Sequence, residues 1–294
     1  MEWLDISRVV VAVVILIFAS YTDWRTRMAS DLNWIILGCS GMVLLGIEML
    51  TLDVQWQYYL FLLPIAVLFL DLFWERRGVL ENGPNLPVLA LYSLLVVSLV
   101  YLYMTLGNDR LFWQYMTVPI MFVLLILMYQ FDVIKGGADA KALIALSLVF
   151  PSYPIFWQFP VFAIPDPLIT IAFPFSLVIL FNAALLSLIV PLGLMFLNLS
   201  RRDVKLPAMF FGYKVAIQDV KRKFVWPMQR VEEGLVRFRY FPKEYEDFDQ
   251  VLEQLANAGE KSIWVTPKMP FLLFITASVL LSAVVGNFVL LFLG

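Results

Sequence analysis

Eight long apolar runs occupy most of this chain, and they constrain its fold more than any other feature. A helix that spans a membrane needs ~20 mostly apolar residues. Hydrophobic residues make up 62% of the sequence and charged residues only 15%, whereas a soluble domain has about 45–50% and about 25%. One soluble core cannot hide that excess, so the bilayer must be the solvent. The runs cover residues 7–23, 34–51, 57–74, 87–106, 112–131, 139–152, 168–199 and 269–293.

Two of these runs depart from a simple span. The sixth is short and is closed by Pro151 and Pro154, so it either extends further or sits at an angle. The seventh is long and contains Pro174 and Pro191, where a membrane helix can kink. We predict an all-α polytopic membrane protein with about eight transmembrane helices, joined to a small α+β domain.

The α+β domain is predicted from residues 200–268, which hold more than half of the charged residues of the chain. Segments 213–217, 235–241 and 262–266 have the composition of short strands. Segment 243–258 places four apolar residues on one face, as an amphipathic helix does. We therefore predict a membrane helical bundle over 1–199, a cytoplasmic α+β domain over 200–268 and a C-terminal transmembrane helix over 269–294.

Positively charged residues in the short loops predict the orientation, because cytoplasmic loops carry an excess of Lys and Arg. If the N-terminus lies outside the cell, six such residues fall on the inner side of the membrane and two on the outer side. The six are Arg25, Arg27, Arg76, Arg77, Lys135 and Lys141, and the two are Arg8 and Arg110. The pattern predicts a multi-pass protein of the cell membrane with an outside N-terminus and a cytoplasmic soluble segment.

The missing residue types exclude much chemistry. The chain has no histidine and one cysteine, Cys39. A Ser-His-Asp triad, a Cys-His dyad and a zinc site of His and Cys are therefore impossible, and no disulfide can form within the chain. The net charge of −2 gives no footprint for nucleic acid. We expect no metal and no cofactor, and acid–base work is left to Asp, Glu, Lys and Tyr.

Two acidic residues lie at the predicted inner ends of spans. Asp23 ends the first run and Asp139 begins the sixth, 116 residues later. Four crossings separate them, and because that number is even, both acids return to the same membrane face. Two neighbouring carboxylates cannot both ionise readily, so one keeps a proton and the other acts as a base. Such a pair suits amide hydrolysis without a metal or a covalent intermediate.

The residues around Asp139 suit close approach of a substrate. Gly136, Gly137 and Ala138 carry almost no side chain, so the backbone can turn and a substrate strand can come near. Lys135 and Lys141 flank the site, where they could keep one carboxylate ionised or contact lipid phosphates.

Simpler interpretations of these residues stay open. Asp23 beside Arg25 and Arg27 is also compatible with an interfacial ion pair, and Asp139 with a helix N-cap. Three rival acids, Asp31, Asp71 and Asp132, are expected on the same face.

Taken in order along the chain, these motifs resemble the type IV prepilin peptidase family, and most closely its archaeal branch, the preflagellin and prepilin peptidases of the GxGD aspartyl proteases. Asp23 with Arg25, Arg27 and Asn33 is similar to the first motif of the family, an Asp followed by a basic loop and Asn. Gly136-Gly137-Ala138-Asp139-Ala140-Lys141 is similar to the second motif. The soluble segment that leads through Trp264-Val265-Thr266-Pro267 into a last span also resembles the archaeal form.

The resemblance implies an intramembrane aspartyl endopeptidase whose catalytic residues are Asp23 and Asp139. Its implied supporting residues are Gly136, Gly137, Ala138, Lys141, Arg25 and Arg27. The implied substrate is a precursor of an archaeal flagellin or pilin-like protein, with a short basic leader before a hydrophobic helix that lies among membrane lipids. The family cuts at the cytoplasmic face.

The chain departs from the family in three ways. Ala138 stands where the motif has glycine, and an extra pair of helices is predicted beyond the six-helix core of the family. The paired cysteines of many bacterial members are missing, so their methyltransferase activity is not implied.

Other functions use similar residues. A presenilin-like or signal-peptide-peptidase-like protease also has two aspartates on neighbouring spans, but the later spans lack a Pro-Ala-Leu motif. A transporter or channel could use intramembrane acids to move protons or ions, although the charges here gather at span ends. A scaffold protein of a secretion system is a third alternative.

Overall fold

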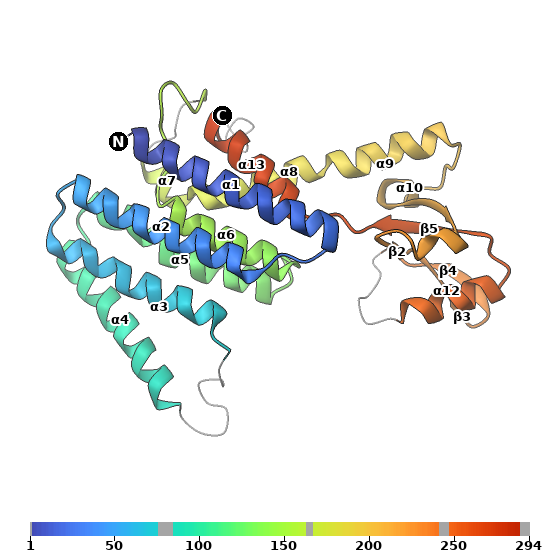
Figure 1. Cartoon of the computed structure of the whole chain (residues 1–294), viewed down its shortest axis with the longest axis horizontal. Helices are drawn as coiled ribbons and strands as arrows, with labels where there is room; N and C mark the ends of the chain where they lie inside the picture. The colour runs from blue at the N-terminus through green and yellow to red at the C-terminus, as the bar shows by residue number, and fades with distance from the viewer. Residues whose placement is uncertain (1, 76–84, 163–166, 241–246, 289–294) are drawn as a thin grey trace. The chain divides into compact units, whose positions relative to one another are not determined.

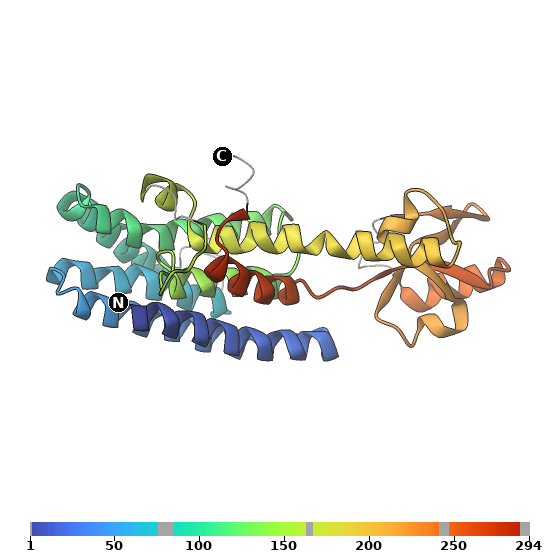
Figure 2. The same cartoon turned by 90° about the horizontal axis from the view of Figure 1, so that it is seen from above.

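The computed structural model describes residues 2–75, 85–162, 167–240 and 247–288 (Figures 1 and 2). The chain divides into two compact units. Met1–Ala184 together with Pro270–Gly294 form the first, which we call the helical unit, and Leu185–Met269 form the second, which we call the α+β unit. Each unit is described by itself. The boundaries predicted at the membrane surface, near residues 200 and 269, stay predictions.

Apolar helices dominate the described residues, and six of them are long and apolar enough to cross a membrane. These spans are Glu2–Thr26 (α1), Asp31–Thr51 (α2), Trp56–Phe73 (η1 and α3), Leu86–Leu106 (α4), Arg110–Gln130 (α5) and Phe175–Ser200 (α8 and α9). Shorter apolar helices are α6 (Gly137–Val149) and α13 (Leu272–Val284). Together with the small α+β unit, they confirm the predicted fold class and make this a multi-pass membrane protein.

The seventh apolar run is divided where the sequence predicts a kink. It contains α7 (Pro167–Ala172), α8 (Phe175–Ser187) and α9 (Ile189–Ser200). Pro174 stands between α7 and α8, and it lacks the N–H that a continuous helix requires. A second interruption falls at Leu188, between α8 and α9, and Pro191 follows it in the first turn of α9, where the backbone N–H groups have no partner within the helix.

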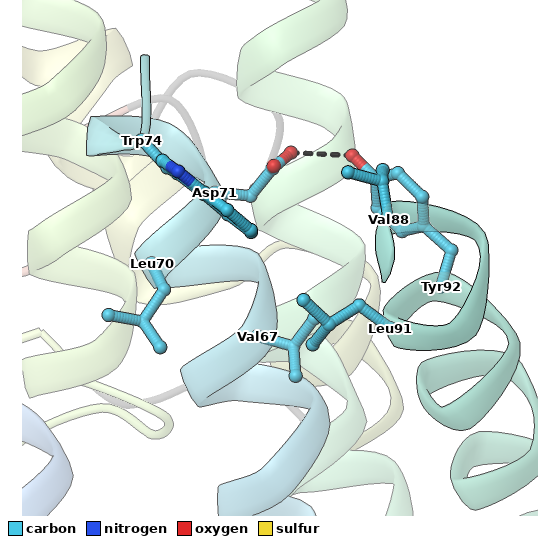
Figure 3. A pocket seen from close by; sticks show the side chains of 7 residues that line it. All are labelled: Val67, Leu70, Asp71, Trp74, Val88, Leu91 and Tyr92. Carbon is cyan, nitrogen blue, oxygen red and sulfur yellow. Dashed lines mark hydrogen bonds between the residues drawn. The ribbon is translucent and has the colours of Figure 1, made fainter. Parts of the chain in front are cut away.

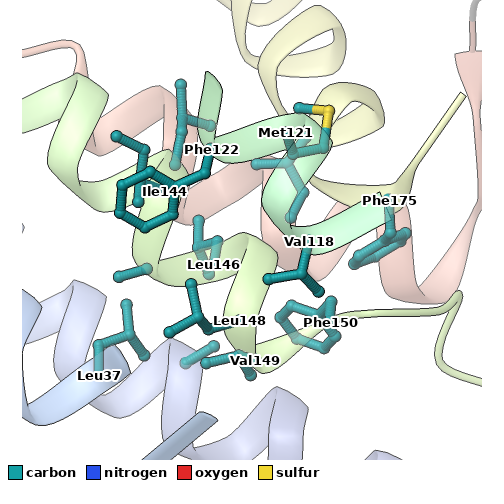
Figure 4. Packing of buried hydrophobic residues seen from close by; sticks show 14 of the residues in the cluster. Leu37, Val118, Met121, Phe122, Ile144, Leu146, Leu148, Val149, Phe150 and Phe175 are labelled. Carbon is teal, nitrogen blue, oxygen red and sulfur yellow. The ribbon is translucent and has the colours of Figure 1, made fainter. Parts of the chain in front are cut away.

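Helix α6 is the centre of the helical unit. Every residue from Ala142 to Phe150 is buried, and α6 contacts α1, α2, α5 and α13. Figure 4 shows Leu146, Leu148 and Val149 of α6 among large side chains of the neighbouring helices. Burial on all sides explains why α6 reads as a continuous apolar run without a polar stripe.

The contact between α2 and α6 depends on one glycine. A Cβ atom on Gly41 would lie 2.7 Å from the backbone N of Val149 and 2.8 Å from the carbonyl carbon of Leu148. Those atoms belong to the backbone of α6 and cannot rotate away. Gly41 therefore lets the two helices approach closely. In the same helix, a Cβ atom on Gly46 would have nothing within 4 Å.

We expect Gly41→Ala to lower the melting temperature of the purified protein, because it forces α2 away from α6. Overpacking of this kind costs about 1–3 kcal/mol. Gly46→Ala is the matched control, and it should raise stability slightly because alanine favours a helix by about 1 kcal/mol over glycine. Thermal melts in detergent compare the two variants. Equal melting temperatures would contradict this account of the packing.

Helix α1 is fixed to its neighbours near both of its ends. Near its start, Arg8 donates to Glu48 of α2 at 2.8 Å, and these two side chains are only 2% and 4% exposed. Asp5 lies 3.4 Å from the same guanidinium. Toward its other end, the hydroxyls of Ser20 and Thr276 are 2.7 Å apart, which links α1 to α13. Removing either partner would leave an uncompensated buried charge, which is strongly destabilising, so Arg8 and Glu48 need each other where α1 packs on α2.

The α+β unit contains two small antiparallel sheets. Strand β5 (Ser262–Pro267) lies between β1 (Tyr213–Ala216) and β2 (Val225–Pro227), and β3 (Gln229–Glu232) pairs with β4 (Leu235–Phe238). Its helices are α9, α10 (Ala208–Phe211), α11 (Ile217–Val220) and α12 (Phe248–Asn257). Tyr213 pairs with Val265, and Gln229 with Phe238. Leu252 and Leu255 of α12 pack into the core with Val265.

Within the described residues, the three predicted strands are confirmed as β1, β4 and β5, although residue 241 of the second prediction lies outside them, and two others are new. Strands β2 and β3 were not predicted, because they are short and β2 ends in Pro227, a residue that argues against a strand. Only three residues of β2 pair with β5, at the edge of the sheet. Helix α12 confirms the amphipathic segment in part, since residues 243–246 of that prediction lie outside the described residues.

Candidate active site

Asp23 lies in the last turn of α1 and is partly buried. The helix ends because Arg27 adopts the left-handed conformation, with a φ of 59°, and its N–H donates to the carbonyl of Asp23 at 2.8 Å. The Arg27 charge acts on the Asp23 carboxylate. Arg25 is exposed and lies over the ring of Tyr21, 5.4 Å from its centroid. The two predicted arginines thus differ, and Arg27 is the one that affects Asp23.

Asp139 lies in the first turn of α6, at the third helical position after the N-cap residue Gly136. Its carboxyl group folds back over Gly136. A Cβ atom on that glycine would overlap Oδ2 of Asp139 and would lie 2.8 Å from its Cγ. Gly136 has an ordinary φ of −85°, so its lack of a side chain matters only for the room it leaves. That room is occupied by the Asp139 carboxylate, at the helix end that favours negative charge.

The neighbouring glycine has a different environment. A Cβ atom on Gly137 would meet the hydroxyl of Tyr129 at 3.4 Å, which is an ordinary contact. Tyr129 comes from the end of α5. The two glycines of the motif are therefore not equivalent, and only Gly136 has its space taken by the candidate catalytic carboxyl.

An ion pair joins the two motifs at one end of the helical unit. Lys141 Nζ lies 2.7 and 2.8 Å from the two carboxylate oxygens of Asp31, at the start of α2. Asp31 follows Asp23 by eight residues, and Lys141 follows Asp139 by two. Asp23 also acts electrostatically on Asp139. The end of α1, the start of α2 and the start of α6 therefore share one end of the bundle.

Lys141 is turned away from Asp139. Two helical positions separate them, which is about 200° around the helix. Besides its pair with Asp31, Lys141 lies 5.2 Å from the ring centroid of Phe73, at the end of α3. Its charge is thus compensated by Asp31. The sequence pattern did not point to this pairing, because Asp31 is 110 residues away.

A pocket with a volume of about 250 Å³ opens on the Lys141 side of α6. Its polar groups are Asp31, Lys141 and the hydroxyl of Tyr129, and its walls include Leu72, Ile126 and Ile144. Gly137, Ala138 and Ala140 contribute the α6 surface. Ala138, the residue that replaces the glycine of the motif, therefore lines this pocket together with the small residues around it.

The rival acids have other environments. Asp71 accepts a hydrogen bond from the hydroxyl of Tyr92 at 2.5 Å, beside a pocket of about 50 Å³ between α3 and α4 (Figure 3). Asp31 is occupied by Lys141. Asp132 is exposed beyond the end of α5, with a φ of 57°. Asp31 and Asp71 each accept from a side-chain donor, Lys141 and Tyr92 respectively. Among the described acidic residues at this end of the bundle, Asp139 instead has Asp23 as its acidic neighbour.

These features define a class: a multi-pass helical membrane protein with two candidate carboxylates at one end of its bundle and a small α+β unit before its last described helix. Comparison with known proteins narrows that class. The archaeal peptidase A24 C-terminus, type II, matches residues 204–288, which include the strands of the α+β unit and α13.

The relatives are archaeal preflagellin peptidases. The chain is 26% identical to the preflagellin peptidase of Methanococcus voltae over 162 residues. These residues are 53% of this chain and 65% of the relative. It is 29% identical to that of Methanocaldococcus jannaschii over 158 residues, 52% of this chain and 63% of the relative. The matches thus span slightly less than two thirds of the length of these relatives. The resemblance predicted from the two motifs is confirmed.

Proposed function

We propose that this protein is an aspartic-type endopeptidase that removes the short basic leader of an archaeal preflagellin or prepilin-like precursor. The observation that carries the proposal is that the segments bearing Asp23 and Asp139 meet at one end of a membrane bundle, where Lys141 pairs with Asp31. The similarity to preflagellin peptidases supports the substrate class. A transporter or a presenilin-like protease has no comparable support.

In the proposed mechanism, the two carboxylates share one proton. The ionised member takes a proton from water, and the protonated member polarises the scissile carbonyl. Positioned acid–base groups contribute ~10²–10⁴-fold to such a reaction. In such a pair the titration belongs to both carboxylates together and not to either residue alone. Gly136 leaves space for Asp139, and Arg27 balances the charge of Asp23 when that residue is ionised.

The proposed orientation places this site at the cytoplasmic face of the cell membrane. The excess of Lys and Arg in the short loops supports an outside N-terminus, although Arg76 and Arg77 of that count lie outside the described residues. The hydrophobic helix of the precursor would lie in the lipid beside the bundle. Its basic leader would then reach water next to Asp23 and Asp139.

A cleavage assay tests the function directly. The purified protein in lipid nanodiscs is mixed with a precursor that carries a basic leader before a hydrophobic helix, and mass spectrometry identifies the new N-terminus. We expect one cut between the leader and the helix. A precursor without its basic leader is the control and should stay intact. No cleavage of the complete precursor, or equal cleavage of both, would contradict the proposed function.

A further inference from the structure

The α+β unit is joined to apolar helical segments at both of its ends. Its first helix, α9, is apolar and ends at Ser200, and the chain leaves the unit at Met269, three residues before α13 begins. On α9, the side chains of Ile189, Leu192 and Phe196 are exposed, as expected for a surface that faces lipid. The residues next to these two junctions must therefore lie close to the membrane surface.

The loop after α9 exposes positive and apolar side chains together. Arg201, Arg202 and Lys205 are exposed, and between and beside them Val204 and Leu206 are 61% and 68% exposed. Lys and Arg that follow a membrane helix directly are typical of contact with anionic lipid. Exposed apolar residues among them can enter the boundary between headgroups and acyl chains.

This loop is held firmly to the rest of the unit. Asn198 is fully buried, and its amide donates to the carbonyls of Met209 at 2.9 Å and Gly212 at 2.7 Å. The N–H of Asp203 donates to the carbonyl of Asn198 at 2.9 Å. The end of α9 and the loop therefore keep one arrangement, and the direction of α9 fixes which way the loop faces.

The nearest acid does not neutralise the arginines. Asp203 makes an ion pair with Lys214, with 2.7 Å between Nζ and Oδ1. Within the described part of the chain, neither Arg201 nor Arg202 has an ion pair with a carboxylate. These two exposed guanidinium groups are therefore available to an anionic partner, and Arg binds phosphate well because its donors form a planar fork.

The second junction repeats the pattern. The N–H of Lys268 donates to the carbonyl of Phe224 at 2.9 Å, which places residues 222–224 beside the point where the chain leaves the unit. Arg222 and Lys223 are exposed, and Phe224 is 53% exposed. The ammonium of Lys268 lies 3.4 Å from the ring centroid of Trp226. Exposed cations thus stand beside apolar side chains at the first junction and beside aromatic ones at the second, as at a membrane interface.

We propose that the α+β unit docks on the anionic headgroups of the membrane through these two junction loops, residues 201–206 and 222–224. Arg201, Arg202 and Arg222 bind lipid phosphates, and Val204, Leu206 and Phe224 enter the interface. The chain as a whole has a net charge of −2, so the attraction comes from the local arrangement and not from an overall positive charge. The proposal does not depend on the peptidase function.

Depth-dependent fluorescence quenching tests the docking in the full-length protein. Exposed Cys39 is first replaced by serine, and a fluorophore is attached to Leu206→Cys. Leu235→Cys is the matched control, since Leu235 is 63% exposed in β4 and lies outside both loops. In phosphatidylglycerol vesicles with nitroxide-labelled lipid, we expect at least about twofold stronger quenching at 206 than at 235. In phosphatidylcholine vesicles the quenching at 206 should fall.

Charge variants then separate lipid binding from simple proximity. Arg201→Gln with Arg202→Gln should reduce the quenching at 206 in anionic vesicles, and Lys261→Gln with Arg237→Gln should not. Equal quenching at 206 and 235 would overturn the proposal. So would equal quenching at 206 in phosphatidylglycerol and phosphatidylcholine vesicles. If inorganic phosphate at millimolar concentration removes the effect of lipid charge at constant ionic strength, the arginines bind free phosphate, and the lipid assignment is wrong.

Discussion

Replacing Asp139 with asparagine should abolish measurable cleavage of the precursor, and replacing Asp23 with asparagine should do the same. Asparagine has nearly the same shape as aspartate, but its amide cannot act as a general acid or base near neutral pH. The expected loss is about 10²–10⁴-fold in kcat, the contribution of a positioned acid–base group. Initial rates of leader removal, measured by mass spectrometry at saturating precursor, provide the comparison.

Asp132→Asn is the matched control for both variants. Asp132 is exposed at the same end of the bundle, and its φ of 57° lies in a region that asparagine adopts as readily as aspartate. Its rate should stay within about twofold of the unmodified protein, as expected for a surface substitution. A wild-type rate for either the Asp23 or the Asp139 variant would remove that residue from the proposed site.

The variant with both substitutions tests whether the carboxylates act as one unit. Groups that share a single catalytic step show strongly non-additive effects. We therefore expect the double variant to be no slower than either single variant. Losses that multiply would instead indicate two independent roles.

Gly136→Ala should reduce cleavage about 10²-fold while the protein still inserts and folds. The added methyl group would overlap the Asp139 carboxylate, which must then rotate away from its place above the helix end. A displacement of about 1 Å at a reacting group can cost 10²-fold in rate. Gly137→Ala is the matched control, because its methyl group would meet the Tyr129 hydroxyl at an ordinary 3.4 Å.

Gly136 is also the N-cap of α6, so the loss must be separated from weaker capping. Alanine is a poor N-cap and costs about 1 kcal/mol, whereas serine is a good one. Gly136→Ser should therefore keep the thermal stability of the protein and still lose cleavage, since it carries the same Cβ atom. Normal cleavage by the serine variant would show that the space above Gly136 has no catalytic importance.

Much of the helical unit could be predicted from the sequence, because the bilayer requires long apolar runs with few alternatives. Each of the eight runs contains a helix in the described residues. The length of α6 was harder to predict. A run that is buried on every side shows no polar face, so nothing in its pattern separates a short central helix from a full span.

The strands of the α+β unit were predicted where β-branched and aromatic residues cluster, as in β5. Strand β2 escaped because three residues that include Pro227 do not form a recognisable pattern. Its pairing with β5 is decided by the fold of the unit, which packs Val225 against the apolar face of α12. Local propensity is too weak to predict such a contact.

The site was predicted in part. The two motifs pointed to Asp23 and Asp139, and their catalytic roles stay predictions. The pairing of Lys141 with Asp31 and the position of the Asp139 carboxyl above Gly136 depend on how distant helix ends meet. The number of spans between two residues predicts only whether they lie on the same membrane face. It does not predict which side chains come into contact there.

The hydrogen bond between Ser20 and Thr276 has a mechanical consequence for Asp23. Asp23 lies three residues beyond Ser20, which is about 4.5 Å of helix rise, so it forms a short overhang past this anchor of α1. The anchor stands on α13, the helix that the chain enters within a few residues of leaving the α+β unit. Any movement of α13 would therefore reach α1 within one turn of the residue that carries one of the two candidate carboxylates.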